Sequence, residues 1–246
     1  MRHQLTFVTS AILLALACSS PTAPSAATTT TTTGTTGTSG APAWYSKFST
    51  AVTVSVEGTN VVLRSTGVPD HVSPYWGAGH ALYEAPHAGM QINPNRISTQ
   101  SIVMRVPMTP ARATASDTPM GVMGVAVNGV ALFNQYAAGR SPLTGEIISF
   151  DRFNGHPQQT GQYHYHLEPL WLTSRDGMAA LIGVLLDGFP VYGPRESDGS
   201  MPSGLDTCNG HTHATTDFAS GTYHYHVTTT VPYISGCFAG TPGSIG

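Results

Sequence analysis

The four-residue motif Tyr-His-Tyr-His occurs twice in this chain, at residues 163–166 and 223–226. Side chains two residues apart in an extended strand point to the same face, so the two histidines of each motif share one face and the two tyrosines share the other. At the usual strand rise their Cα atoms lie about 6.6 Å apart, and two imidazoles at that separation can converge on one ion. The spacing therefore suggests metal coordination.

Each motif ends a longer repeated unit, and the two units span residues 124–166 and 183–226. Both begin with Gly-Val, continue with an Asn-Gly or Asp-Gly pair, and reach an aspartate, an Asn-Gly-His turn and then the motif. The same landmarks in the same order, separated by loops of slightly different length, indicate an internal duplication.

The duplication adds a third histidine to each pair, in the Asn-Gly-His turn. The expected metal ligands are His164, His166, His224, His226, His156 and His211. Three nitrogens per unit suffice for a site with an open coordination position. Asp151 and Asp206 precede the two turns, and we expect them to bind the second ring nitrogens of the histidines and fix their tautomers. His213, and His71 from outside the repeat, are further candidates.

Copper and zinc are the ions that we expect as cofactor. Imidazole suits both, and the general affinity order favours copper. Calcium fits less well, because the sequence contains no acidic cluster with regular spacing. The sequence leaves open whether the two units share one site or hold two.

Two other interpretations also remain open. In the first, the histidines form a buried hydrogen-bonded network in a non-enzymatic surface module, and exposed motif tyrosines stack on a polysaccharide or contact a protein partner. In the second, the metal site activates water or dioxygen, although the motif lacks a general base such as the glutamate of a zinc-protease signature. Ser-His-Asp hydrolysis is least supported, since no Gly-x-Ser-x-Gly turn occurs. The sequence identifies no particular protein or glycan partner.

Short strands joined by tight turns must position these histidines. Apolar and polar residues alternate over residues 52–56, and a second apolar run follows the turn-prone residues 57–60, which predicts a hairpin. Residues 101–106 are a further strand candidate. The runs 125–133 and 181–192 are each split by Asn-Gly or Asp-Gly, the pairs that favour hairpin turns.

The fold class that follows is all-β. Helical periodicity is weak after the first 18 residues, and the chain contains 27 glycines and 18 prolines. We predict a sandwich or barrel-like domain over residues 43–246, with the internal duplication and with short helices in loops such as 134–138. Two related sheets packed face to face, or a closed barrel, would accommodate the duplication.

The N-terminal residues predict export. Arg2, the apolar run 11–17 and Cys18 form a signal peptide over residues 1–18 with a lipobox-like end. We expect a lipid on Cys18 to attach the protein to a membrane of the bacterial cell envelope; an ordinary signal peptide cleaved slightly later is the alternative. Residues 19–42 are almost wholly Thr, Ser, Ala, Gly and Pro, a composition typical of a disordered linker.

Cysteine usage and charge restrict the remaining possibilities. If Cys18 carries lipid, Cys208 and Cys237 are left to form a disulfide around the second motif. The chain has a formal net charge of −3, and Lys47 is its single lysine. Nucleic-acid binding is therefore not expected, because no basic patch is available to neutralise phosphates.

These motifs resemble the YHYH-domain family, which is named for the tetrapeptide. The matching segments, which extend between Gly67 and Cys237, are Asn128-Gly129-Val130, Asn154-Gly155-His156-Pro157, Gly161-Gln162-Tyr163-His164-Tyr165-His166, Asp187-Gly188-Phe189-Pro190-Val191-Tyr192-Gly193-Pro194, Cys208-Asn209-Gly210-His211 and Gly221-Thr222-Tyr223-His224-Tyr225-His226. The resemblance implies an exported or surface domain, often in lipoproteins, and implies no particular reaction. One departure is Phe153, where the second unit has Cys208; if relatives carry a cysteine there, packing holds the first unit instead of a disulfide.

Overall fold

The computed structural model describes residues 40–246. The expected signal peptide, the lipid attachment at Cys18 and nearly all of the expected linker lie outside this range. The described residues form strands in several sheets with little helix, which confirms an all-β, sandwich-like architecture. Within residues 40–246 no helix is long and apolar enough to cross a membrane.

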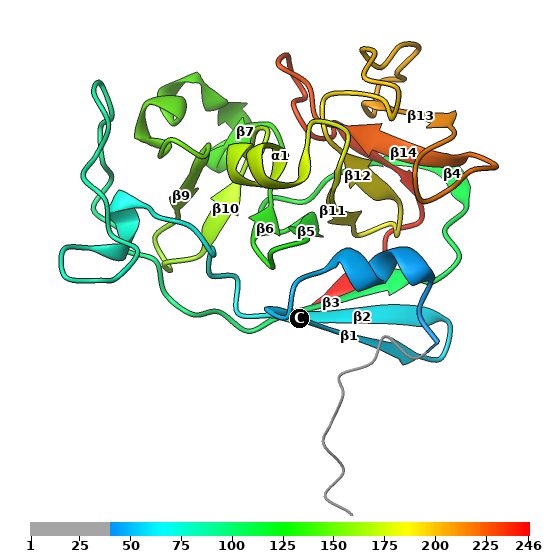
Figure 1. The fold of residues 1–246 in the computed structure, drawn as a ribbon, viewed down its shortest axis with the longest axis horizontal. Helices are drawn as coiled ribbons and strands as arrows, with labels where there is room; N and C mark the ends of the chain where they lie inside the picture. The colour runs from blue at the N-terminus through cyan, green and yellow to red at the C-terminus, as the bar shows by residue number, and fades with distance from the viewer. Residues whose placement is uncertain (1–39) are drawn as a thin grey trace, which may run out of the picture. The chain divides into compact units, whose positions relative to one another are not determined.

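The two repeated units share one eight-stranded sheet with the order β13-β14-β12-β11-β5-β6-β10-β9. Figure 1 shows the strands of the first unit on one side of this sheet and those of the second unit on the other. The first unit contributes β5 (Gly124–Ala126), β6 (Ala131–Leu132), β9 (Gly155–Pro157) and β10 (Tyr163–Tyr165). The second contributes β11 (Leu181–Leu185), β12 (Pro190–Tyr192), β13 (Gly210–His213) and β14 (Thr222–His226). Each unit is a hairpin, a crossover to a parallel motif strand, and an antiparallel strand that brings the turn histidine beside that motif.

The units join through the antiparallel pair β5 and β11. Val125 pairs with Val184, its own counterpart in the other unit, and the flanking pairs Gly183–Ala126 and Leu185–Gly124 exchange equivalent positions. This register is that of a local two-fold axis. The expectation of two related sheets facing each other, or of a closed barrel, differs from this edge-to-edge arrangement, in which pairing β5 with β11 removes one exposed strand edge from each unit.

A smaller sheet packs on the duplicated one and completes the core. Its order is β1-β2-β3-β16, from β1 (Val52–Glu57), β2 (Asn60–Ser65), β3 (Ile102–Pro107) and β16 (Ser244–Ile245). The predicted hairpin is β1 and β2, and the further strand candidate is β3. Buried apolar residues of both sheets form one cluster. The turn glycines Gly129 and Gly188, both with positive φ, lie against Ser65 and Pro107 at opposite ends of the small sheet, where a Cβ atom would collide.

The remaining elements are short. Two ribbons pair β4 (Arg112–Asp117) with β15 (Cys237–Gly240) and β7 (Tyr136–Ala137) with β8 (Ser141–Pro142). The helices are α1 (Leu170–Asp176) and the 3-10 turns η1 (Ala43–Lys47), η2 (Pro74–Trp76), η3 (Ala138–Arg140), η4 (Leu143–Gly145) and η5 (Ile147–Ser149). The loop 134–138, expected to be helical, forms strand β7 and only the start of η3.

Candidate metal centres

The first histidine group, here called the first centre, consists of His156, His164 and His166. His156 on β9 pairs directly with His164 on β10, and His166 follows two residues later, directly after the last residue of β10. A cross-strand pair and an i, i+2 pair place all three rings on one face. The Nε2 atoms of His164 and His166 are 3.0 Å apart. All three side chains are buried.

The second centre repeats this arrangement with His211, His224 and His226. His211 on β13 pairs with His224 on β14, and His226 follows two residues later. The Nε2 atom of His224 is 3.2 Å from that of His211 and 3.0 Å from that of His226. In both centres one ligand atom from each histidine lies within 4.8 Å of the others. The six predicted ligands are therefore brought together in two groups of three.

The two centres are separate. The motif strands β10 and β14 lie on opposite sides of the central pair β5 and β11 (Figure 1), with four strands between them in the sheet order. Five strand spacings correspond to roughly 20 Å or more. The question left open by the sequence is answered in favour of two groups, one in each unit.

A tight turn presents the third histidine of each centre. Asn154 and Asn209 adopt positive φ, 66° and 70°, a conformation that asparagine tolerates better than most residues. The Asp151 carboxylate accepts hydrogen bonds from the backbone N–H groups at positions 153 and 155, and Asp206 does the same at 208 and 210. Each aspartate thus holds the turn that carries the histidine.

The predicted role of these aspartates was different, and the structure corrects it. Asp151 accepts a hydrogen bond from the hydroxyl of Tyr163 at 2.6 Å, and Asp206 accepts from Tyr223 at 3.1 Å. Both carboxylates therefore bind the tyrosine side of the motif strands. They position the histidines through the backbone of the turn and the tyrosine, whereas the expectation was direct contact with the imidazole rings.

Other groups bind the second ring nitrogens. The Nδ1 atoms of five rings face backbone carbonyl oxygens: His164 faces Gln162, His166 faces Asn134, His211 faces Ser203, His224 faces Thr222 and His226 faces Gly193. The Nδ1 atom of His156 faces the Ser149 hydroxyl at 2.7 Å, and that hydroxyl donates its own proton to the carbonyl of Glu146. Because a carbonyl oxygen can only accept, those five rings carry their proton on Nδ1. His156 does the same, because the single hydroxyl proton of Ser149 is directed to Glu146.

This tautomer leaves the inward-facing Nε2 atoms as bare acceptors. Lone pairs that face each other at 3.0 to 3.2 Å repel unless a proton or a cation lies between them. Metal–nitrogen bonds of 2.0–2.1 Å in a tetrahedron would separate neighbouring nitrogens by roughly 3.3 Å, close to the distances seen here. The six rings have the geometry and the tautomer of metal ligands.

Burial disfavours a proton, as opposed to a metal ion, between the facing nitrogens. It lowers the pKa of His166, His224 and His226 to about 4 and, together with the nearby His166, lowers that of His156 to about 3. Burial also holds the pKa of His164 well below its usual value. At neutral pH these five rings are uncharged, so an imidazolium that donates from the Nε2 of one of them to the next is disfavoured.

A carboxylate that was missed at the sequence level stands beside each centre. The carboxylate of Glu196 lies 3.2 Å from Nε2 of His211 and 3.5 Å from Nε2 of His226, and its second oxygen lies 3.2 Å from Nδ1 of His213. Glu146 lies at 3.7 Å from His156 and 4.0 Å from His166. Both glutamates follow the unit hairpin and precede the Asn-Gly-His turn, which is the signal that could have identified them.

The tyrosines of the motifs are core residues. Tyr163, Tyr165, Tyr223 and Tyr225 are between 0% and 4% exposed. Tyr165 is hydrogen-bonded to His71, and Tyr225 donates to Asp187. His71 therefore lies on the tyrosine side of the motif strand and belongs to neither histidine group. A glycan-stacking platform made from these tyrosines requires exposure that the structure does not give them.

The predicted disulfide between Cys208 and Cys237 is present. It ties the strand after the second motif to the residue just before the Asn209-Gly210-His211 turn. In the first unit Phe153 occupies the position of Cys208 and packs edge-on against His71 and Trp171, with ring centroids 4.6 and 5.4 Å apart. Packing replaces the covalent link in that unit.

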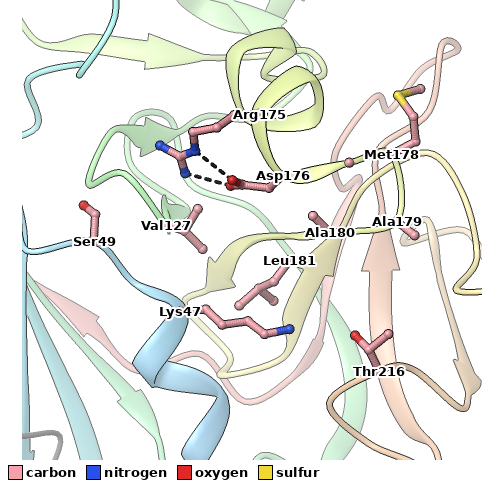
Figure 2. A pocket seen from close by; sticks show the side chains of 11 residues that line it. Lys47, Ser49, Val127, Arg175, Asp176, Met178, Ala179, Ala180, Leu181 and Thr216 are labelled. Carbon is pink, nitrogen blue, oxygen red and sulfur yellow. Dashed lines mark hydrogen bonds and ion pairs between the residues drawn. The ribbon is translucent and has the colours of Figure 1, made fainter.

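A cavity of about 830 Å³ borders the first centre and is lined by its three histidines and Glu146. A second cavity, of about 700 Å³, involves neither centre and is lined by Lys47, Arg175 and apolar residues of β11 and the preceding loop (Figure 2). Its cations are already paired: Arg175 binds Asp176 at 2.7 Å, and Lys47 binds Asp217 at 2.6 Å. We assign no function to this second cavity.

Comparisons with known proteins give one match. The family model described as "YHYH protein" matches residues 103–202 and 196–240, and each segment contains one copy of the motif and one histidine centre. No curated protein and no solved structure matches the chain. The matched residues cover more than half of the chain, and the protein therefore belongs to the YHYH family.

Proposed function

We propose that this protein binds two transition-metal ions, copper or zinc, one at each centre. The observation that carries the proposal is the common arrangement of the six histidines: each Nδ1 faces a hydrogen-bond acceptor, and one nitrogen of each ring lies within 4.8 Å of those of its two partners. Three imidazoles and a nearby carboxylate form a ligand set that suits zinc and copper.

The same proposal places the protein outside the cytoplasm. A signal peptide that ends at Cys18, followed by a linker, would hold the metal-binding domain near a membrane of the cell envelope. There the domain would store, deliver or sense metal ions. The disulfide between Cys208 and Cys237 supports an oxidising compartment.

Elemental analysis of protein purified without a histidine tag tests metal binding. We expect two bound copper or zinc ions per chain after loading and dialysis, with a Kd below micromolar at each centre. Protein that retains no metal and shows no micromolar affinity in titrations would contradict the proposal.

Matched variants assign the ions to the centres. His156→Gln and His211→Gln change equivalent positions, and each is expected to lose one of the two ions. His80→Gln is the control, because its ring stacks on Trp76 in a loop and belongs to neither centre. The control should keep both ions.

A further inference from the structure

The two centres differ in how their carboxylate is held. The side chain of Glu196 is 7% exposed, and contacts from His211, His226 and His213 at 3.2 to 3.5 Å surround it. The side chain of Glu146 is 34% exposed and stays 3.7 to 4.0 Å from the nearest imidazole nitrogens. A tetrahedral ion at the second centre therefore has its fourth ligand in place, whereas one at the first centre does not.

The first centre also borders free space. Its three histidines form one wall of the cavity of about 830 Å³, a size typical of small-molecule sites. Besides the histidines, the described residues that line the cavity include one charged side chain, Glu146. Amide groups of Asn93, Asn95 and Gln158 and the rings of Phe133 and Tyr136 make up much of the remaining lining.

We propose that the first centre keeps a coordination position open to this cavity and binds an uncharged, hydrogen-bonding small molecule on its metal, while the second centre is closed and structural. The inference rests on the proposed metal binding. Amides and aromatic rings match a neutral polar ligand. The negative Glu146 beside the open position disfavours an anion.

Cobalt(II) spectroscopy on single-centre variants tests the proposal, with imidazole at pH 8 as the neutral probe. His211→Gln leaves only the first centre loaded, and His156→Gln leaves only the second. We expect imidazole to shift the cobalt d–d absorption of His211→Gln protein with saturation, and to bind at least tenfold more weakly to His156→Gln protein. Equal responses, or a response of the second centre alone, would overturn the proposal.

The cavity and the charge can be tested in the same His211→Gln background. Gly145 lines the cavity, and a Cβ added to it meets no atom within 4 Å. Gly145→Leu should therefore narrow the cavity and weaken imidazole binding severalfold with cobalt affinity unchanged. Glu146→Gln should raise the affinity for azide severalfold. Unchanged imidazole binding in the first variant, or unchanged azide binding in the second, would contradict the assigned ligand class.

One further outcome separates the two proposals. If neither single-centre variant binds cobalt, and the unsubstituted protein also binds none, metal binding itself fails. If both centres bind cobalt with equal access to imidazole, metal binding stands and the difference between the centres is wrong. Adding Glu196→Ala to the His156→Gln protein gives a converse check, because removing the buried carboxylate should open the second centre to imidazole.

Discussion

Gly155 lies directly against the phenol ring of Tyr163, and a Cβ atom at Gly155 would overlap the tyrosine hydroxyl. Gly210 has the same relation to Tyr223 in the second unit. Close packing therefore requires a glycine directly before each turn histidine. It lets the strand of the histidine approach the motif strand while the tyrosine hydroxyl stays bound to its aspartate.

Gly155→Ala is expected to disturb the first centre and to leave the second intact. The added methyl group must displace the Tyr163 ring or β9, which should cost about 1 to 3 kcal/mol in the free energy of unfolding. Gly145→Ala is the control, since a Cβ there meets open space. Urea denaturation and metal stoichiometry check the result, and an unfolding midpoint equal to that of the control would argue against it.

The stability of the metal-free protein should fall as the pH is lowered from about 6.5 to 4. Burial lowers the pKa of His166, His224 and His226 to about 4, against 6.5 for an unperturbed histidine. Between these values the unfolded chain binds more protons than the folded one, so each imidazole removes up to about 1.4 kcal/mol per pH unit. Above pH 6.5 this contribution is fully present.

Urea denaturation of chelator-treated protein at pH 7, 6 and 5 measures this dependence. His156→Gln should show a shallower loss of stability on acidification, because one buried imidazole is absent. A midpoint that stays constant between pH 7 and pH 5 would show that folding does not lower the pKa values of these histidines.

The local parts of this structure were predictable, because they depend on short-range rules. Alternation along a strand placed His164 and His166 on one face and the tyrosines on the other, and the Asn-Gly and Asp-Gly pairs located both unit hairpins. The all-β fold followed from the same kind of pattern. The disulfide followed from the cysteine count, because Cys208 and Cys237 remain once Cys18 is assigned to lipid.

The errors and omissions concern relations over longer distances. The face of the sheet toward which a loop carboxylate points depends on the geometry of the turn, which the sequence does not define. Asp151 and Asp206 were therefore expected to bind the imidazoles, whereas they bind the tyrosines. Glu196 comes 3 residues after Gly193, whose carbonyl binds His226, whereas Glu146 comes 12 residues after its counterpart Asn134. Because these two loops differ by 9 residues, the sequence alignment of the two units does not reveal that Glu146 and Glu196 are equivalent. The edge-to-edge union of the two units depends on tertiary packing.

Asp187→Ala is expected to destabilise the protein by about 3 kcal/mol. The buried carboxylate accepts from the Tyr225 hydroxyl at 2.6 Å and from the backbone N–H groups of Ala239 and Gly240 at 3.1 and 3.0 Å. Its loss removes the acceptor of the Tyr225 hydroxyl and of the Gly240 N–H, whereas the Ala239 N–H keeps the Tyr225 oxygen at 2.8 Å. Asp187→Asn should give an intermediate loss, because the amide keeps an acceptor oxygen. Asp198→Ala, at an exposed loop position, should leave the urea midpoint unchanged, and a similar midpoint for Asp187→Ala would contradict the network.

The last prediction compares the two different ways of holding the Asn-Gly-His turn. Replacing both Cys208 and Cys237 by serine should lower the free energy of unfolding by about 3 kcal/mol, because a cross-link over 29 positions no longer restricts the unfolded chain. The turn of His211 begins directly after Cys208. We therefore expect metal affinity to fall at the second centre and to be retained at the first.

Phe153→Ala is the counterpart in the first unit. The ring is partly exposed, so we expect a loss of about 2 kcal/mol, below that for a fully buried phenylalanine. Here the first centre should weaken and the second should not. Titration of each variant with zinc, after His156→Gln or His211→Gln has isolated one centre, measures the two affinities separately. If either change weakens both centres equally, the turns are not held independently, because the shared sheet then transmits the disturbance through the β5–β11 pair.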